Sequence, residues 1–105
     1  MRVEWTPLAL ERVEAIARYI ARGNPAAAVG WVNDLFDAVE RLGDFPERGR
    51  MVPEVGVRRI REMIFGAYRV IYSVGDRVVI LTVRRGSQLL RPSELDDALK
   101  GPSAD

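Results

Sequence analysis

The stretch from Tyr68 to Arg85 constrains the fold more strongly than any other part of this sequence. Two runs rich in β-branched and aromatic residues flank Gly75 and Asp76, a dipeptide typical of a two-residue hairpin turn. A turn at this position pairs Val74 with Arg77 and thereby fixes the register of the whole hairpin. The sequence therefore predicts two antiparallel strands whose side chains alternate between two faces.

The predicted register, which places Tyr68 opposite Val83, divides the hairpin into an apolar face and a mixed face. The apolar face is predicted to lie in the core and consists of Tyr68, Val70, Tyr72, Val79, Leu81 and Val83. The mixed face consists of Arg69, Ile71, Ser73, Val78, Ile80, Thr82 and Arg84. Because it combines arginines with apolar side chains, we expect the mixed face to be the functional surface.

The composition excludes several kinds of active site. The chain of 105 residues has the size of one domain and contains neither cysteine nor histidine. A disulfide framework, a thiolate metal site and a histidine-based catalytic site are thereby excluded, and we expect no metal and no other cofactor. The sequence shows no signal peptide and no apolar run of about 18 residues, so we expect a cytoplasmic protein that does not span a membrane.

The charges are segregated along the chain. Residues 1–47 carry five arginines and eight acids, residues 48–91 ten arginines and three acids, and residues 92–105 one lysine and four acids. A basic middle segment, which contains the hairpin, therefore lies between two acidic ends. Arginine suits bidentate contacts to phosphate or carboxylate groups, so we expect a polyanionic or acidic partner for the β-region.

Two helices are predicted in the first half of the chain. Thr6-Pro7 and Asn24-Pro25 each combine a capping side chain with proline at the first helical position. Apolar residues at helical spacing follow each cap, and Gly23 and Gly43 end the two segments. We expect an αα-hairpin whose apolar stripes pack on the apolar face of the sheet.

Further elements are predicted on both sides of these helices. Residues 2–5 are predicted to form a short first strand, and residues 57–65 an irregular strand with a bulge or a strand end near residues 62–65. A loop covers residues 43–56, a short helix starts at Pro92, and residues 101–105 are predicted to be disordered. The order β-α-α-β-β-β predicts one α+β domain over residues 1–100. Its helical hairpin packs on one face of a mainly antiparallel sheet, with a short C-terminal helix and the other face partly open.

This order of elements and several short strings resemble the RelE/ParE superfamily of toxins from type II toxin–antitoxin modules. The strings that carry the resemblance are Tyr19-Ile20, Asn24-Pro25-Ala26-Ala27, Leu42 through Phe45-Pro46 to Gly49-Arg50, Arg61-Glu62, Tyr68-Arg69-Val70-Ile71-Tyr72 and Ile80-Leu81-Thr82-Val83-Arg84. Each string is short, but their order and spacing over residues 3–92 together are specific.

The resemblance implies a small cytoplasmic toxin that a co-encoded antitoxin binds and holds inactive in a hetero-oligomeric complex. RelE-like members of the superfamily cleave mRNA in the ribosome, and ParE-like members inhibit DNA gyrase. Because the fold is shared, the fold does not distinguish the two targets.

RNA cleavage without a metal requires a base, an acid and cations beside the phosphate. By the resemblance, Arg69 matches the arginine of the Tyr-Arg-x-x-Tyr string that RelE-like nucleases use at the phosphate. The predicted register places Arg84 diagonal to Arg69, and Arg61 and Glu62 lie on the preceding strand. These four residues are the candidate catalytic set if the chain is a nuclease. The alternative is that Arg69 pairs with a carboxylate such as Glu62.

Departures from the nuclease pattern favour a toxin that does not cut RNA. RelE-like nucleases have lysines on the strand before the Tyr-Arg-x-x-Tyr string and a tyrosine or histidine near the chain end. Here that strand has no lysine, no tyrosine or histidine follows Val83, and Arg85 stands where many relatives have histidine. Since arginine does not exchange a proton near neutral pH, Glu62 is the remaining proton carrier nearby. We therefore favour ParE-like inhibition of gyrase. The alternatives are a RelE-like endoribonuclease and a degenerate, non-toxic antitoxin-binding partner.

The mixed face of the hairpin also suits a partner protein. Apolar side chains between arginines fit an amphipathic, acidic segment of an antitoxin. The candidate partner-binding residues are Arg59, Arg69, Ile71, Val78, Ile80, Arg84 and Arg85. The alternative is that residues 86–100 of the same chain cover this face.

Overall fold

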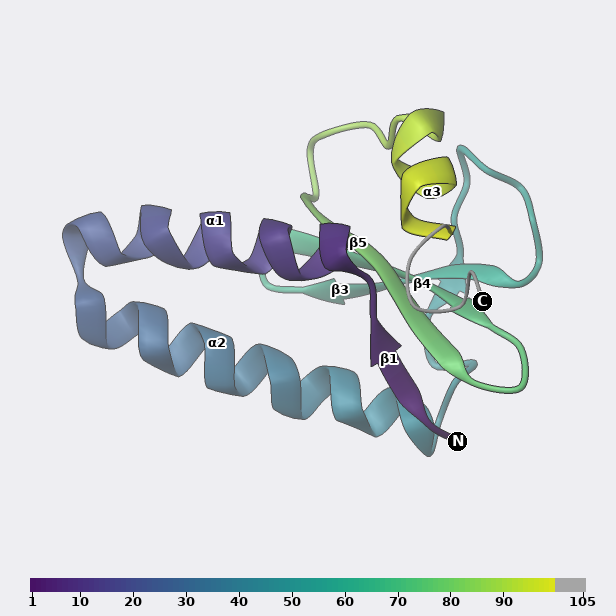
Figure 1. The fold of residues 1–105 in the computed structure, drawn as a ribbon, viewed down its shortest axis with the longest axis horizontal. Helices are drawn as coiled ribbons and strands as arrows, with labels where there is room; N and C mark the ends of the chain where they lie inside the picture. The colour runs from purple at the N-terminus through teal and green to yellow at the C-terminus, as the bar shows by residue number, and fades with distance from the viewer. Residues whose placement is uncertain (100–105) are drawn as a thin grey trace.

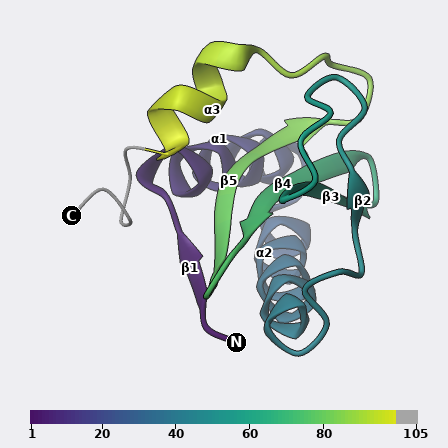
Figure 2. The same cartoon turned by 90° about the vertical axis from the view of Figure 1, so that its right-hand side faces the viewer.

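The computed structural model describes the backbone of residues 1–99 and the side chains of residues 1–95. The tail predicted to be disordered, residues 101–105, lies outside the described residues. The elements are β1 (Val3–Trp5), α1 (Pro7–Gly23), α2 (Pro25–Glu40), η1 (Arg41–Gly43), β2 (Arg50–Met51), β3 (Ile60–Phe65), β4 (Tyr68–Val74), β5 (Val78–Arg85) and α3 (Pro92–Leu99). Figure 1 shows α1 and α2 as a helical pair beside the sheet, and Figure 2 shows α3 next to α1. The predicted α+β class is confirmed, and β2 is a short strand within the predicted loop.

The strands form one sheet with the order β1-β5-β4-β3-β2. Three of its strand pairs are antiparallel and β1 lies parallel to β5, so the sheet is mainly antiparallel as predicted. β3 pairs regularly with β4 from Ile60 to Phe65. Of the two alternatives predicted near residues 62–65, the bulge is wrong and the strand end is confirmed, because β3 ends at Phe65. The strand begins at Ile60 rather than Val57.

Capping side chains start both long helices, as predicted. The Oγ1 atom of Thr6 accepts a hydrogen bond from the backbone N–H of Ala9 at 3.1 Å, and Oδ1 of Asn24 accepts one from Ala27 at 3.0 Å. Proline follows each cap, at a helical position whose N–H would have no partner. The α-helical part of α2 ends at Glu40, where the chain tightens into the 3₁₀ turn η1 instead of continuing as an α-helix.

The register of the β4–β5 hairpin differs from the predicted one. The connection is a three-residue loop, Gly75 to Arg77, in which the Gly75 N–H donates to the Arg77 carbonyl at 3.0 Å. As a result Val74 pairs with Val78 instead of Arg77. The register shifts again between the pairs formed by Ile71 and Tyr72, which leaves Leu81 as an extra residue on β5, a β-bulge.

These two shifts exchange the faces of the residues near the turn. Val78 and Ile80, predicted on the mixed face, are fully buried against the helices, whereas Val79 and Leu81 pack on the opposite side of the sheet. One extra loop residue inverts the alternation of β5, and the bulge restores it from Thr82 onward. The predicted face of Val78 and Ile80 is therefore wrong, and neither side chain is exposed to a partner.

Apolar residues form a core on each side of the sheet. The larger cluster lies between the sheet and the helices α1 and α2, and the second lies on the opposite face. The buried members of the second cluster are Val52, Ile60, Ile71, Val79, Leu81 and Leu90. The loop after β2 and the segment after β5 thus cover the face that was predicted to be partly open, and Ile71 is fully buried there. The alternative that residues 86–100 cover the mixed face is confirmed in part: Leu90 and Leu95 pack beside Ile71, but the loop after β2 contributes as well, and Val78 and Ile80 are buried by the helices instead.

Candidate functional site

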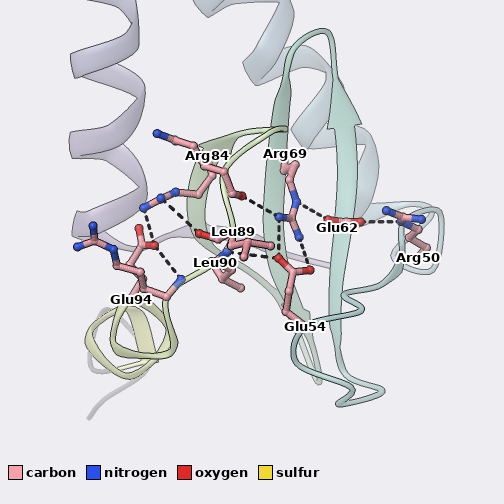
Figure 3. Close-up of polar contacts among 10 residues, drawn as sticks. Arg50, Glu54, Glu62, Arg69, Arg84, Leu89, Leu90 and Glu94 are labelled. Atoms are coloured by element: carbon pink, nitrogen blue, oxygen red, sulfur yellow. Dashed lines mark hydrogen bonds and ion pairs between the residues drawn. The ribbon is translucent and has the colours of Figure 1, made fainter.

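Arg69 lies on the second face of the sheet, directly opposite Arg84 in the β4–β5 pair. Its Nε donates to Oε1 of Glu62 at 2.6 Å, and its two terminal nitrogens donate to the two oxygens of Glu54 at 2.9 and 3.0 Å. Figure 3 shows this guanidinium between the two carboxylates, and only 8% of the side chain is exposed. The hydrogen bonds to Glu54 raise the pKa of Arg69, although burial acts in the opposite direction. Arg69 therefore pairs with carboxylates, as the alternative interpretation of the sequence predicted.

Glu62 bridges two arginines. Its second oxygen, Oε2, accepts a hydrogen bond from Nε of Arg50 on β2 at 2.6 Å, and its side chain is fully buried. The register explains the contact, because Arg50 lies directly opposite Glu62 in the β2–β3 pair. Both carboxylate oxygens are therefore occupied by guanidinium groups.

Arg84 is paired in a similar way. Its Nη1 donates to Oε2 of Glu94 at 2.7 Å, and Nη2 of Arg12 on α1 donates to Oε1 at 2.8 Å. Burial of Glu94 opposes its ionisation, but the hydrogen bond from Arg84 and the charges of both arginines outweigh burial and lower its pKa. Glu94 thereby attaches α3 to β5 and α1.

The other predicted site residues are dispersed. Arg61 pairs with Tyr72 across the β3–β4 pair and points to the helix side of the sheet, where it donates to the Gly49 carbonyl at 2.8 Å. Arg59 and Arg85 are exposed. The structure therefore brings together Arg69, Glu62 and Arg84, and it separates Arg61 from them.

Two carboxylates that complete these ion pairs, Glu54 and Glu94, were not predicted as site residues. Glu54 comes from the loop after β2 and Glu94 from the first turn of α3. One signal could have found Glu54: it is one of only three acids among ten arginines in residues 48–91. A buried arginine in such a segment has few acids available to pair with it.

Glu54→Gln is expected to lower the free energy of unfolding by about 1–2 kcal/mol at pH 7, a value reduced for partial exposure of the pair. The hydrogen bond from Arg69 is the main reason why the pKa of Glu54 falls from 4.5 to about 2. A lowered pKa stabilises the folded state above the ordinary value of 4.5, and this contribution is lost as the pH falls through 2. Urea unfolding of the wild type and of Glu54→Gln at several pH values between 2 and 4.5 measures the difference in their free energy of unfolding. A difference that stays constant down to the lower limit would contradict the assignment.

The described residues contain no group of histidine, cysteine or acidic side chains that could hold a metal ion. Within the same residues, no helix has both the length and the apolar character required to cross a bilayer.

Comparison with known sequences identifies the family. The family model described as "ParE toxin of type II toxin-antitoxin system, parDE" matches residues 3–90. The chain is 33% identical over 89 residues to the protein Y4kP of Sinorhizobium fredii, covering 83% of this chain and 90% of that protein. It is also 33% identical over 90 residues to Toxin RelE2 of Caulobacter vibrioides, covering 84% of this chain and 98% of that protein.

A solved structure supports the same relationship. A chain in the "Chromosomal ParDE TA system from P. aeruginosa" superposes with a TM-score of 0.67 at 25% sequence identity. The match covers 81% of this chain and 95% of that chain. These findings confirm the resemblance stated from the sequence: the chain belongs to the ParE toxin family of type II toxin–antitoxin systems, within the RelE/ParE superfamily.

Proposed function

We propose that a cognate antitoxin binds this toxin and holds it inactive, and that the free toxin inhibits DNA gyrase by binding to it. We favour gyrase because the arginines that a nuclease would use at the phosphate are already paired with carboxylates. Arg69 is held by Glu62 and Glu54, and Arg84 is held by Glu94. A scissile phosphate would have to displace these carboxylates from largely buried guanidinium groups, which is costly.

Proton transfer at this face also lacks a suitable group among the described side chains. Both oxygens of Glu62 accept hydrogen bonds from arginines, and the pKa of Glu54 is held at about 2. Tyr72 lies on the opposite, helix side of the sheet; its hydroxyl accepts from the Gly49 N–H and donates to the Pro46 carbonyl, and burial raises its pKa. A general acid or base that works near neutral pH needs a pKa close to that range. Inhibition by binding needs no such group.

One observation favours a second candidate, ribosome-dependent cleavage of mRNA. Arg69 and Arg84 are direct cross-strand partners, so two guanidinium groups come from neighbouring positions on one face. One of the relatives is named Toxin RelE2. Release of Glu54 and Glu94 would present both arginines to a phosphate. Substitution of Arg69 by alanine is a poor test of this candidate, because it would also leave the buried Glu62 with one partner fewer.

Purified toxin is expected to block supercoiling of relaxed plasmid by gyrase and to leave ribosome-bound mRNA intact. Induced expression of the toxin alone is expected to arrest growth, and co-expression of the neighbouring antitoxin gene is expected to restore it. A supercoiling assay and a primer-extension assay of translated mRNA, run on one preparation, separate the two targets. Cut mRNA together with unimpaired supercoiling would overturn the gyrase proposal in favour of cleavage. Growth without arrest would contradict both candidates and favour a non-toxic antitoxin-binding protein.

A further inference from the structure

A small cleft of about 200 Å³ lies between α1 and the end of β5. The helix packs against this strand, and Figure 1 shows the two side by side. On α1, the lining residues Arg12, Ile16 and Tyr19 follow one another at helical spacing, so they lie on one stripe of the helix. Arg84 and Arg85 line the cleft from β5. The fold thus brings cationic and aromatic side chains together at one place.

The positive charge of this cleft exceeds the negative charge around it. Arg12, Arg84 and Arg85 line the cleft, and no lining residue is acidic. Arg12 and Arg84 share one carboxylate, that of Glu94, at 2.8 and 2.7 Å. Arg85 is exposed and forms no ion pair with a carboxylate among the described side chains. Three guanidinium groups against one carboxylate leave an excess of two positive charges.

Two of these arginines also have a hydrogen-bond donor without an acceptor. The Nε atoms of Arg12 and Arg84 are buried, and no acceptor among the described residues lies within hydrogen-bond distance of them. Only 11% of the Arg84 side chain is exposed. Buried donors of this kind are generally matched by an ordered water or a bound ion. The unused donors therefore indicate an anion, independently of the charge count.

The same cleft has an aromatic surface and an apolar floor. Tyr19 is 60% exposed and lies two turns after Arg12, about 10 Å farther along the helix axis. Ile16 and Val83 supply apolar side chains between the polar ones, and Gln88 supplies an amide that both donates and accepts. An exposed aromatic ring offers a stacking surface to a planar base. The arrangement suits an anion that carries a planar group.

We propose that this cleft, the α1–β5 cleft, binds a nucleoside 5′-monophosphate. Its phosphate accepts hydrogen bonds from Arg12, Arg84 and Arg85, and its base stacks on Tyr19. A phosphomonoester carries a charge of roughly −1.5 to −2 at neutral pH, which offsets the excess of two positive charges. The inference goes beyond the proposed function, because it requires neither gyrase nor an antitoxin as the partner.

Other phosphate ligands match the α1–β5 cleft less well. A phosphodiester carries one negative charge per phosphate and leaves part of the positive charge uncompensated, and inorganic phosphate has no group to contact Tyr19. The volume lies below the roughly 300 Å³ at which pockets for drug-sized ligands begin, so it suits one nucleotide rather than a strand. Arg69 does not line the cleft, so the site is separate from the arginine that the nuclease candidate would use.

The first experiment titrates ¹⁵N-labelled toxin with adenosine 5′-monophosphate in phosphate-free buffer, followed by calorimetry and NMR. We expect saturable binding that shifts the Nε–H signals of the arginines and the amide signals of Tyr19 and Gln88. Arg85→Gln and Tyr19→Ala should each weaken binding about tenfold. Both side chains are exposed, so neither change removes a buried contact. Arg12 and Arg84 are left unchanged, because their loss would also release Glu94.

Matched controls separate the site from general effects of substitution. Tyr19→Phe keeps the ring and should bind as the wild type does. Arg22→Gln removes an exposed arginine in the last turn of the same helix, outside the cleft, and should leave binding unchanged. Phe45→Ala removes an aromatic ring that is 64% exposed elsewhere and should also have no effect.

The second experiment varies the ligand. Adenosine, inorganic phosphate and the methyl phosphodiester of adenosine 5′-monophosphate should each bind at least about tenfold more weakly than the monophosphate. An octadeoxyadenylate with a 5′-phosphate, compared with the same strand bearing a 5′-hydroxyl, distinguishes a strand end from a free nucleotide as the source of the phosphomonoester. Binding of the phosphorylated strand alone supports the strand end, and binding of neither strand supports the free nucleotide.

Four results would overturn the inference. These are no saturable binding of adenosine 5′-monophosphate, unchanged binding by Arg85→Gln or by Tyr19→Ala, equal affinity for the monophosphate and its methyl diester, and equal, Arg85-dependent binding of the two strands. The last result would assign the cleft to a phosphodiester backbone instead of a nucleotide. None of these results bears on inhibition of gyrase or on neutralisation by the antitoxin, so the proposed function is tested separately.

Discussion

Gly49→Ala is expected to lower the free energy of unfolding by about 3 kcal/mol. A Cβ atom at Gly49 would lie 2.3 Å from the backbone oxygen of Glu62 and 2.5 Å from the phenolic oxygen of Tyr72. The first neighbour belongs to β3, and the second belongs to a fully buried side chain, so neither can move without disturbing the sheet or the core. Separation of these groups would also break the hydrogen bonds of Tyr72 to Gly49 and Pro46.

Gly30→Ala is the matched control for this prediction. Gly30 lies within α2, and a Cβ there would meet no atom within 4 Å. Because alanine loses less backbone entropy than glycine in a helix, we expect this variant to be more stable by about 0.5–1 kcal/mol. Urea unfolding followed by circular dichroism measures both variants. If the two alanine variants shift the midpoint in the same direction, the close approach at Gly49 is contradicted.

Glu62→Gln is expected to cost about 3 kcal/mol of folding free energy, because it removes a buried carboxylate from between two arginines. Arg50 can turn into water, since 70% of its side chain is exposed, but only 8% of the Arg69 side chain is exposed. Glutamine offers one oxygen acceptor, and its NH₂ group would face the other guanidinium, donor against donor. Arg69 would retain Glu54 as its only carboxylate partner.

Glu14→Gln is the control for Glu62→Gln. Glu14 forms an ion pair with Arg18 on the surface of α1, where both side chains are about 70% exposed. Exposed pairs of this kind contribute about 0.5 kcal/mol or less. Thermal and urea unfolding of both variants at pH 7 test the contrast. Equal losses of folding free energy in the two variants would show that the buried Glu62 carboxylate stabilises the fold no more than an exposed one does.

The helical half of the fold could be predicted from local sequence. Thr6-Pro7 and Asn24-Pro25 place capping acceptors and prolines directly before two amphipathic segments, and the structure confirms both starts. These signals act between residues three positions apart, so no distant part of the chain has to be known.

The sheet was predicted less well because its register depends on single residues. Arg69 and Arg84 were placed on the correct face, whereas Val78 and Ile80 were not. The three-residue loop and the bulge at Leu81 each shift the pairing by one residue. The first shift inverts the faces to which β5 side chains point near the turn, and the second restores them farther along. The faces are therefore predicted wrongly only for residues 78–81 of β5.

The candidate site shows the same division between sequence and structure. The sequence by itself determined the family, the helical hairpin and a basic β-region without histidine, cysteine or a nearby lysine, because these follow from residue identity and local spacing. Only the tertiary structure decided that Glu54 and Glu94 pair with Arg69 and Arg84, and that Arg12 and Arg85 line one cleft between α1 and β5. These two outcomes have the same physical reason. Each depends on where a loop or helix distant in sequence packs, and packing is a property of the whole folded chain.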